Sequence, residues 1–354
     1  MDFDLTEDRQ MLSDSLNRFL ADKYPVEHRT KVAYAEPYHD PALWDGIAEL
    51  GALFALASED KGGFGGSGFD ISVVFEAMGR VICPEPVLGA LLASRILSHT
   101  DADQEALLSG AVRYAVGLGE IEAPYDLSFI KTEAQKSGDG YTVTGRKSAV
   151  YGGQAAEVIL VAAKLDGKLA VLSVKAADAD VTGYGMMDGG GAAEVLLDGT
   201  PAELVLADAE AAIQDAVNAG IVALCSEAVG AMEVLHAMTV DYLKQRKQFG
   251  RAIGSFQALQ HRAVDMLTEI EQSRSIVIKA ASELNGEDAT KFCAMAKNLI
   301  GRAGRLVAEE AIQMHGGIAM TWEYPGSHYA KRIIMIDAQL GDTDYQLAKV
   351  ASAA

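Results

Sequence analysis

The chain has 354 residues, of which 49% are hydrophobic and 23% are charged. This composition supports a sizeable folded core and excludes an intrinsically disordered chain. The formal net charge is −20, which argues against non-specific nucleic-acid binding and against docking on an anionic membrane. An anionic ligand would therefore have to be bound by a local basic segment.

The three cysteines, Cys83, Cys225 and Cys293, are widely spaced, and no pair of them has the spacing of metal ligands. We expect reduced, mostly buried thiols in a cytoplasmic protein, and no metal site. The acidic residues 1–8 lack the basic and apolar regions of a signal peptide. We also predict no membrane-spanning helix, because no run of apolar residues is expected to reach the length needed to cross a bilayer.

The first 110 residues are predicted to form a helical domain, with Thr6 as a helix N-cap. Apolar residues recur at helical spacing in four segments: 5–21, 42–57, 70–82 and 86–98. The glycine-dense run 59–68 lacks the Gly-Lys-Ser/Thr ending of a phosphate-binding loop. This run is therefore predicted to be a flexible connector.

Alternating apolar and polar residues indicate an antiparallel β domain over residues 111–209. Gly138-Asp139-Gly140 and Asp166-Gly167 are typical of hairpin turns. Strands are expected around these segments: 112–118, 141–144, 158–163, 169–174 and 193–197.

Helical periodicity returns over residues 210–354. Four long helices are predicted: 212–246, 255–284, 288–315 and 328–352. Their alanine- and glycine-rich faces favour close packing in a bundle. The predicted fold class is therefore α+β, with an N-terminal helical domain, a middle antiparallel β domain and a C-terminal four-helix bundle.

One segment, residues 246–257, combines basic, amide and aromatic side chains with two glycines. Arg246 can bind phosphate oxygens in bidentate fashion. Phe249 can stack on a flat ring, and Gln257 can hydrogen-bond to a base or ribose. This mixture suits a large anionic ligand that carries a flat ring. A helix end, a glycine turn and a second helix with surface basic residues would explain the same pattern.

This segment resembles the Arg-x-x-Phe-Gly motif of the acyl-CoA dehydrogenase family. Gln313-Met314-His315-Gly316-Gly317 and Gly145-Arg146-Lys147 extend the resemblance, which covers essentially the whole chain. The opening residues 1–7, the stretch 83–86 and the ending 340–344 are similar to one branch. That branch is the small subunits of pimeloyl-CoA-type two-subunit acyl-CoA dehydrogenases.

The resemblance implies FAD-dependent α,β-dehydrogenation of an acyl-CoA thioester, with electron-transfer flavoprotein as the acceptor. In the family, one subunit binds the isoalloxazine ring through its β domain, and a second subunit reaches over to hold the pyrophosphate and adenosine. His315 is expected to be a packed histidine at a helix end. By similarity, the cofactor-binding residues here are Arg246, Phe249, Gln257, Gln313, Gly316, Gly317 and Thr343.

The chain departs from the family at its own flavin face and at the catalytic base. Gly119 and Tyr125 replace the Thr and Ser that touch flavin and pyrophosphate, and Ala149 replaces the Trp that packs on the flavin. Gly341 occupies the position of the family's catalytic glutamate. The candidates for an alternative base are Asp342, Asp344 and Glu227.

The residues that would reach into a partner's FAD site are kept, while those that would serve this chain's own flavin and substrate are changed. This contrast favours a non-catalytic subunit that completes the FAD site of a homologous catalytic partner in a 2+2 heterotetramer. Two alternatives stay open. The chain could be a self-sufficient acyl-CoA dehydrogenase that uses Asp342, Asp344 or Glu227 as base, or a flavin-free acyl-CoA-binding or scaffold protein.

Overall fold

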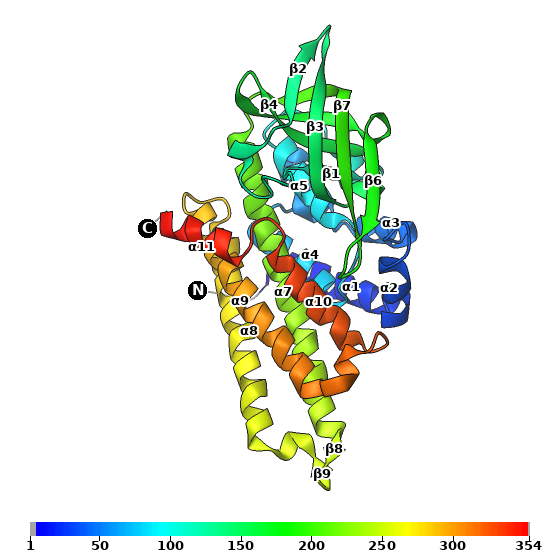
Figure 1. Ribbon diagram of the computed structural model, residues 1–354, viewed down its shortest axis with the longest axis vertical. Helices are drawn as coiled ribbons and strands as arrows, with labels where there is room; N and C mark the ends of the chain where they lie inside the picture. The colour runs from blue at the N-terminus through cyan, green and yellow to red at the C-terminus, as the bar shows by residue number, and fades with distance from the viewer. Residues whose placement is uncertain (1–4, 353–354) are drawn as a thin grey trace. The chain divides into compact units, whose positions relative to one another are not determined.

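A computed structural model of the chain describes residues 5–352 (Figure 1). The opening residues Met1–Asp4, which contribute to the family resemblance, lie outside this range. Contacts divide the chain into two compact units. The bundle unit contains the residues up to Val26, Ile71–Cys83 and the residues from Ile221 onwards, and the sheet unit contains Glu27–Asp70 and Pro84–Gly220.

Long helices build the bundle unit, and three of them begin and end within two residues of the predicted positions. These are α7 (Glu210–Gln245, which starts in the sheet unit), α8 (Gln257–Glu283) and α9 (Ala289–His315). The helix α1 (Glu7–Lys23) begins after Thr6, whose side chain accepts from the Arg9 amide as predicted for an N-cap. Most of α4 (Gly68–Arg80) also belongs to this unit.

The fourth predicted bundle helix, 328–352, is wrong as a single helix. The structure has α10 (Pro325–Asp337) and α11 (Thr343–Ser352), joined by the turn 338–342. Leu340 and Gly341 have φ angles of 55° and 101°, which no α-helix accommodates. Asp342 then starts α11 by accepting a hydrogen bond from the Tyr345 amide at 2.8 Å.

Glycines bring α4 and α7 into direct backbone contact. A Cβ atom at Gly79 would lie 2.0 Å from the Glu227 carbonyl oxygen, and one at Gly230 would lie 2.3 Å from the Glu76 carbonyl oxygen. Only glycine permits such an approach. Close packing through glycines is therefore present between α7 and α4, a helix outside the four C-terminal helices for which it was predicted.

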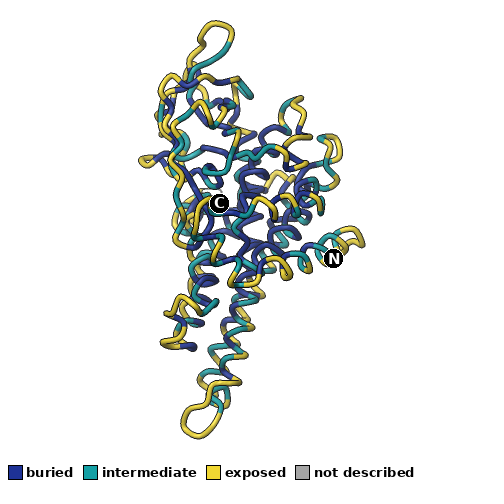
Figure 2. The backbone as a smooth tube through the Cα atoms, turned by 90° about the vertical axis from the view of Figure 1, so that its right-hand side faces the viewer, coloured by how far each residue is buried: buried dark blue, intermediate teal, exposed yellow. Residues whose placement is uncertain are grey.

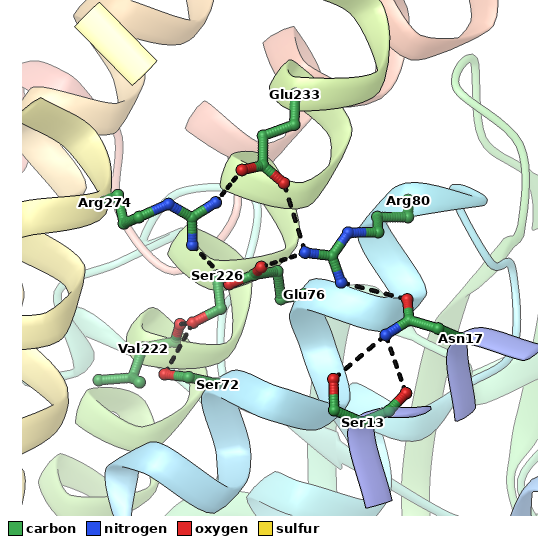
Figure 3. Close-up of polar contacts among 9 residues, drawn as sticks. All are labelled: Ser13, Asn17, Ser72, Glu76, Arg80, Val222, Ser226, Glu233 and Arg274. Atoms are coloured by element: carbon green, nitrogen blue, oxygen red, sulfur yellow. Dashed lines mark hydrogen bonds and ion pairs between the residues drawn. The ribbon is translucent and has the colours of Figure 1, made fainter. Parts of the chain in front are cut away.

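An ion-pair network joins α1, α4, α7 and α8 within the bundle unit (Figure 3). The Arg274 guanidinium pairs with Glu76 at 3.0 Å and with Glu233. The Arg80 guanidinium pairs with the same two carboxylates and donates to Asn17 Oδ1 at 3.1 Å. Each carboxylate is thus shared by two guanidinium groups, which identifies the cluster as a structural connection between helices.

The helix α7 is long and apolar enough to pass a length-and-composition test for a membrane span, contrary to the expectation that no segment would. In the window that passes, 72% of the residues are buried inside the structure. Such burial is typical of a helix in a protein core. In Figure 2 the central part of α7 is dark blue, the colour of buried residues.

In the sheet unit, short helices accompany the sheet. They are α2 (Val26–Ala33), α3 (Pro41–Glu49), α5 (Val87–Leu97) and α6 (Glu105–Leu108). The prediction missed α2 and α6. The predicted helix 42–57 ends at Glu49, because the chain turns at Gly51 with a φ of 78°.

Seven strands form one sheet, whose pairings β4–β2–β3–β7–β5–β4 close into a ring. Five of the seven pairings are antiparallel, whereas β1–β4 and β2–β4 are parallel. Aliphatic side chains such as Val143, Val161 and Leu172 form the core. The strands are β1 (Tyr114–Gly117), β2 (Glu133–Ser137), β3 (Gly140–Tyr151), β4 (Val158–Leu165), β5 (Lys168–Lys175), β6 (Asp180–Gly185) and β7 (Gly191–Leu206).

Both predicted hairpin turns are confirmed. Asp166 and Gly167, with φ angles of 50° and 78°, join β4 to β5. Gly138, with a φ of 59°, lies in the turn between β2 and β3. Positive φ at both central residues of the β4–β5 turn is the geometry that Asp-Gly favours.

The glycine-dense run 59–68 is more ordered than a flexible connector. The amides of Gly65 and Gly66 donate to the carbonyls of Ala57 and Ala55 at 2.9 and 2.8 Å. A Cβ atom at Gly63 would lie 2.1 Å from the Ala57 carbonyl oxygen, so glycine is needed for close packing. These amides are already used within the protein and do not form a phosphate cradle.

Candidate functional site

The segment after α7 that resembles the family's Arg-x-x-Phe-Gly motif folds into a two-stranded hairpin, which we call the basic hairpin (residues 246–256). Its strands are β8 (Lys247–Gln248) and β9 (Arg251–Ala252). Phe249 and Gly250 form the turn, with φ angles of 53° and 77°. Figure 1 shows β8 and β9 at the end of α7, where the chain turns toward α8.

The basic hairpin presents cations and an aromatic ring to solvent. Phe249 is 89% exposed and lies edge-to-face with Phe256, and the Arg251 guanidinium lies 4.1 Å from the centre of the Phe256 ring. Within residues 5–352, the side chains of Arg246 and Lys247 form no hydrogen bond and no ion pair. In a chain of net charge −20, these groups are suited to bind an anionic ligand with a flat ring.

The second family motif lies at the C-terminal end of α9. Gln313, Gly316 and Gly317 are exposed. A Cβ atom at either glycine would have no heavy atom within 4 Å, so the backbone there is open to close approach by a ligand.

His315 lies between these residues, but it is buried as predicted. Its Nδ1 lies 2.8 Å from the Ala311 carbonyl oxygen, and burial lowers the pKa of the ring. The ring centre is 4.7 Å from that of Tyr242 on α7. The Tyr242 carbonyl in turn accepts a hydrogen bond from the Arg246 amide. His315 thus connects the end of α9 to the base of the basic hairpin.

The remaining predicted cofactor residues divide into two groups. Gln257 is exposed in the first turn of α8, and an ion pair between Arg262 and Glu310 holds that part of α8 against the last turns of α9. Thr343 lies elsewhere, because its carbonyl accepts from Asn298 of α9. Asn298 is about 25 Å along that helix from His315, at 1.5 Å per residue. The structure therefore gathers six of the seven predicted residues at one end of the bundle unit and leaves Thr343 apart.

Glu227, one of the candidate bases, is held in an ion pair. Both of its carboxylate oxygens accept from Arg332, at 2.6 and 2.7 Å. The Glu227 side chain is 6% exposed and that of Arg332 is 12% exposed. A carboxylate engaged on both oxygens is poorly placed to accept a proton from a substrate, and this geometry favours a structural role.

The two candidate aspartates belong to the start of α11. Asp342 caps the helix through the Tyr345 amide, and Asp344 lies exposed in its first turn. Carboxylates at these positions stabilise a helix N-terminus. The capping hydrogen bond is enough to explain an aspartate at position 342 without a catalytic role.

Gly341, at the position of the family's glutamate, has a backbone conformation that disfavours a side chain. Its φ is 101°, where residues with a Cβ are strained. A Cβ atom there would lie 2.5 Å from Gln346 Nε2 and 2.6 Å from Tyr345 Cδ1. The backbone at position 341 therefore favours glycine over glutamate.

The two segments of the sheet unit that replace the family's flavin-facing elements lie together. The Ser148 amide donates to the Gly119 carbonyl at 3.1 Å. A Cβ atom at Gly119 would lie 2.6 Å from the Pro124 carbonyl oxygen, so the family's threonine does not fit this conformation. Ala149 has a φ of 50°, and Glu194 accepts from its amide and from the Ser148 hydroxyl. These residues do not provide the family's side chains for an isoalloxazine ring.

Sequence reasoning missed a buried ion pair that supports this region. Lys147 Nζ donates to Glu120 Oε1 at 3.1 Å and to the Leu118 carbonyl at 3.0 Å, and the two charged side chains are 0% and 6% exposed. Burial lowers the pKa of Lys147 to about 8, although the Glu120 charge opposes this. Gly145-Arg146-Lys147 marked the strand, but no local pattern links it to residue 120.

Glu120 has a pKa of about 2. Burial acts to raise this pKa, but hydrogen bonds from the Thr132 hydroxyl and from the Lys131 and Thr132 amides lower it further than burial raises it, with help from the Lys147 charge. The folded-state pKa thus lies below the ordinary value of 4.5.

We expect the stabilisation from Glu120 to be complete above pH 4.5 and to be lost as the pH falls from 4.5 toward 2. Between pH 6 and pH 3, the unfolding free energy of Glu120→Gln should change less than that of the unaltered chain. The difference over this window is bounded by roughly 2 kcal/mol, at about 1.4 kcal/mol for each pH unit below 4.5. Urea unfolding at both pH values measures it. Glu122→Gln, at an exposed neighbour, is the control, and equal pH dependence of all three proteins would contradict the assignment.

Within residues 5–352, no group of three or more His, Cys, Asp or Glu side chains could hold a metal ion. The three cysteines are buried, as predicted, and none of them forms a disulfide within residues 5–352.

Comparisons with known proteins agree with this architecture. Residues 6–110 match the family described as "Acyl-CoA dehydrogenase, N-terminal domain", and residues 211–354 match "Acyl-CoA dehydrogenase, C-terminal domain". Acyl-CoA dehydrogenase IpdE2 of Mycobacterium tuberculosis is 30% identical over 333 residues, which cover 92% of this chain and 91% of that protein.

Two solved structures are similar over nearly their full length. A chain of the ChsE4-ChsE5 complex from Mycobacterium tuberculosis has a TM-score of 0.91 at 25% identity, covering 99% of this chain and 98% of that chain. Butyryl-CoA dehydrogenase from Megasphaera elsdenii shares the fold, with a TM-score of 0.89 at 24% identity over 100% and 99% of the two chains. The chain therefore belongs to the acyl-CoA dehydrogenase family of FAD-dependent oxidoreductases.

Proposed function

We propose that this chain is a non-catalytic subunit of an FAD-dependent acyl-CoA dehydrogenase, whose basic hairpin completes the FAD site of a homologous catalytic partner. The geometry of Gly341 carries the proposal. At the position of the family's base, the backbone has a φ of 101° and a Cβ position 2.5 Å from Gln346 Nε2, so a glutamate there would be strained.

The residues fit FAD on one side and not on the other. The basic hairpin and the open Gly316-Gly317 backbone suit the pyrophosphate and adenosine. The Gly119 and Ala149 segments lack the family's side chains for the isoalloxazine ring. When bound, FAD supplies a hydride acceptor for the β-hydrogen of the acyl group. In this proposal, the partner subunit holds the flavin ring and the base.

We propose a 2+2 heterotetramer as the assembly. The ChsE4-ChsE5 relative, a complex of two named chains, supports pairing with a different chain. We also propose that electron-transfer flavoprotein accepts the electrons and that the complex works in the cytoplasm.

The test is to purify the chain alone and together with its homologous catalytic partner, and to measure flavin absorbance and acyl-CoA oxidation. We expect one FAD for every two chains in the active complex, and neither FAD nor turnover in the isolated chain. One FAD per chain with turnover in the isolated chain would instead support a self-sufficient enzyme that uses Asp342, Asp344 or Glu227 as base. Absence of flavin in every pairing would support the flavin-free scaffold.

Arg246→Ala is expected to weaken FAD binding by the complex about 10- to 150-fold, because a charge-assisted phosphate contact contributes about 1.5–3 kcal/mol. Titration of the flavin-depleted complex with FAD, followed by flavin fluorescence, measures this change. Arg18→Ala is the control, since Arg18 is an exposed arginine on α1. FAD affinity equal to that of the control would remove the hairpin from the cofactor site.

A further inference from the structure

A buried lysine contacts the turn that replaces the family's base. Lys297 of α9 has a fully buried side chain. Its Nζ donates to the Asp337 carbonyl at 2.8 Å and to the Gly341 carbonyl at 2.9 Å. One ammonium group therefore binds the last residue of α10 and the centre of the turn 338–342 together.

Other hydrogen bonds close the same turn from both sides. Gln346 Nε2 donates to the Leu340 carbonyl at 2.8 Å, and the Thr343 hydroxyl donates to Asp337 Oδ1 at 2.9 Å. Leu340 and Gly341 both have positive φ angles. Such a backbone is strained at a residue like leucine and persists only where its surroundings determine it.

The groups around Lys297 show that backbone carbonyls stabilise its buried ammonium charge. The nearest carboxylate oxygen, Asp337 Oδ1, is 3.9 Å from Nζ, which is too far for a hydrogen bond. The ammonium group is satisfied instead by carbonyls, one of them at the C-terminal end of α10, where the helix dipole is negative. Burial lowers the pKa of Lys297. Burying the ammonium group without these carbonyls would cost free energy. The buried lysine and the closed turn therefore depend on each other.

We propose that Lys297 is a positioning residue that clamps the α10–α11 turn closed over position 341, so that this subunit excludes a base at that position. The inference rests on the proposed non-catalytic function and states how the fold enforces it. A glutamate introduced at position 341 would need the turn to open, and opening would remove the Gly341 carbonyl from the buried ammonium group.

The clamp is tested by hydrogen exchange on the full chain in its complex. In Lys297→Met, the amides of residues 338–346 should exchange at least about tenfold faster, because local opening governs their exchange. Lys291→Met, on the same helix, is the control and should leave them unchanged. Equal exchange in the two variants would overturn the clamp. FAD content is measured on the same samples, and it reports on the proposed function independently of the clamp.

A second pair of variants keeps the test valid if Lys297→Met does not fold. Gly341→Ala should lower the melting temperature more than Gly199→Ala, whose glycine has a φ of 63° but no atom within 4 Å of a Cβ position. Equal losses would mean that position 341 is not closed. Gly341→Glu should add no turnover to the complex, and a gain in turnover would also overturn the proposal.

Discussion

Glu227→Gln is expected to lower the free energy of unfolding by about 3–5 kcal/mol, because it leaves the Arg332 guanidinium buried without its charge partner. The two groups form a bidentate pair at 2.6 and 2.7 Å and are nearly buried. Neutral glutamine keeps the shape of the side chain, so the loss reports on the charge. Urea unfolding measures the effect, with Glu271→Gln at an exposed site of α8 as control.

The same variant also tests whether Glu227 is a base. If its role is structural, turnover per folded complex should stay within about twofold of the unaltered complex at a temperature where both are folded. A loss of turnover of a hundredfold or more, with stability intact, is the size expected for removal of a general base. That outcome would revive the self-sufficient enzyme.

Lys147→Met is expected to lower the free energy of unfolding by a similar amount, about 3–5 kcal/mol, because Glu120 would remain buried without a cation. Lys136→Met, at an exposed position of β2, is the matched control. Thermal and urea unfolding measure the difference.

A double variant separates the pair from its two members. Combining Lys147→Met with Glu120→Gln removes both charges, and we expect it to recover part of the stability lost in Lys147→Met. Strictly additive losses would mean that the two side chains do not interact in solution, despite the distance of 3.1 Å.

Local patterns were sufficient to predict much of the fold. The helices α7, α8 and α9 follow from apolar periodicity, and the Asp166-Gly167 turn follows from the preference of that dipeptide for positive φ. The turn 338–342 was missed, because the apolar pattern continues through it while the break depends on backbone angles at Leu340 and Gly341.

The candidate site was predicted unevenly for the same reason. Arg246 and Phe249 belong to one short motif, and their exposure follows from the hairpin that the motif forms. The ion pairs of Lys147 with Glu120 and of Glu227 with Arg332 join residues 27 and 105 positions apart. Such pairs are set by tertiary packing, and no spacing in the sequence indicates them.

The glycine contacts between α4 and α7 also limit how the bundle unit can move. Gly79 faces the Glu227 carbonyl and Gly230 faces the Glu76 carbonyl, so the two helices contact each other at two points. Sliding one helix by a single residue, about 1.5 Å, would bring side chains against backbone carbonyls at both points. Shear between α4 and α7 is therefore blocked, and any motion that accompanies assembly must carry the two helices together as one rigid body.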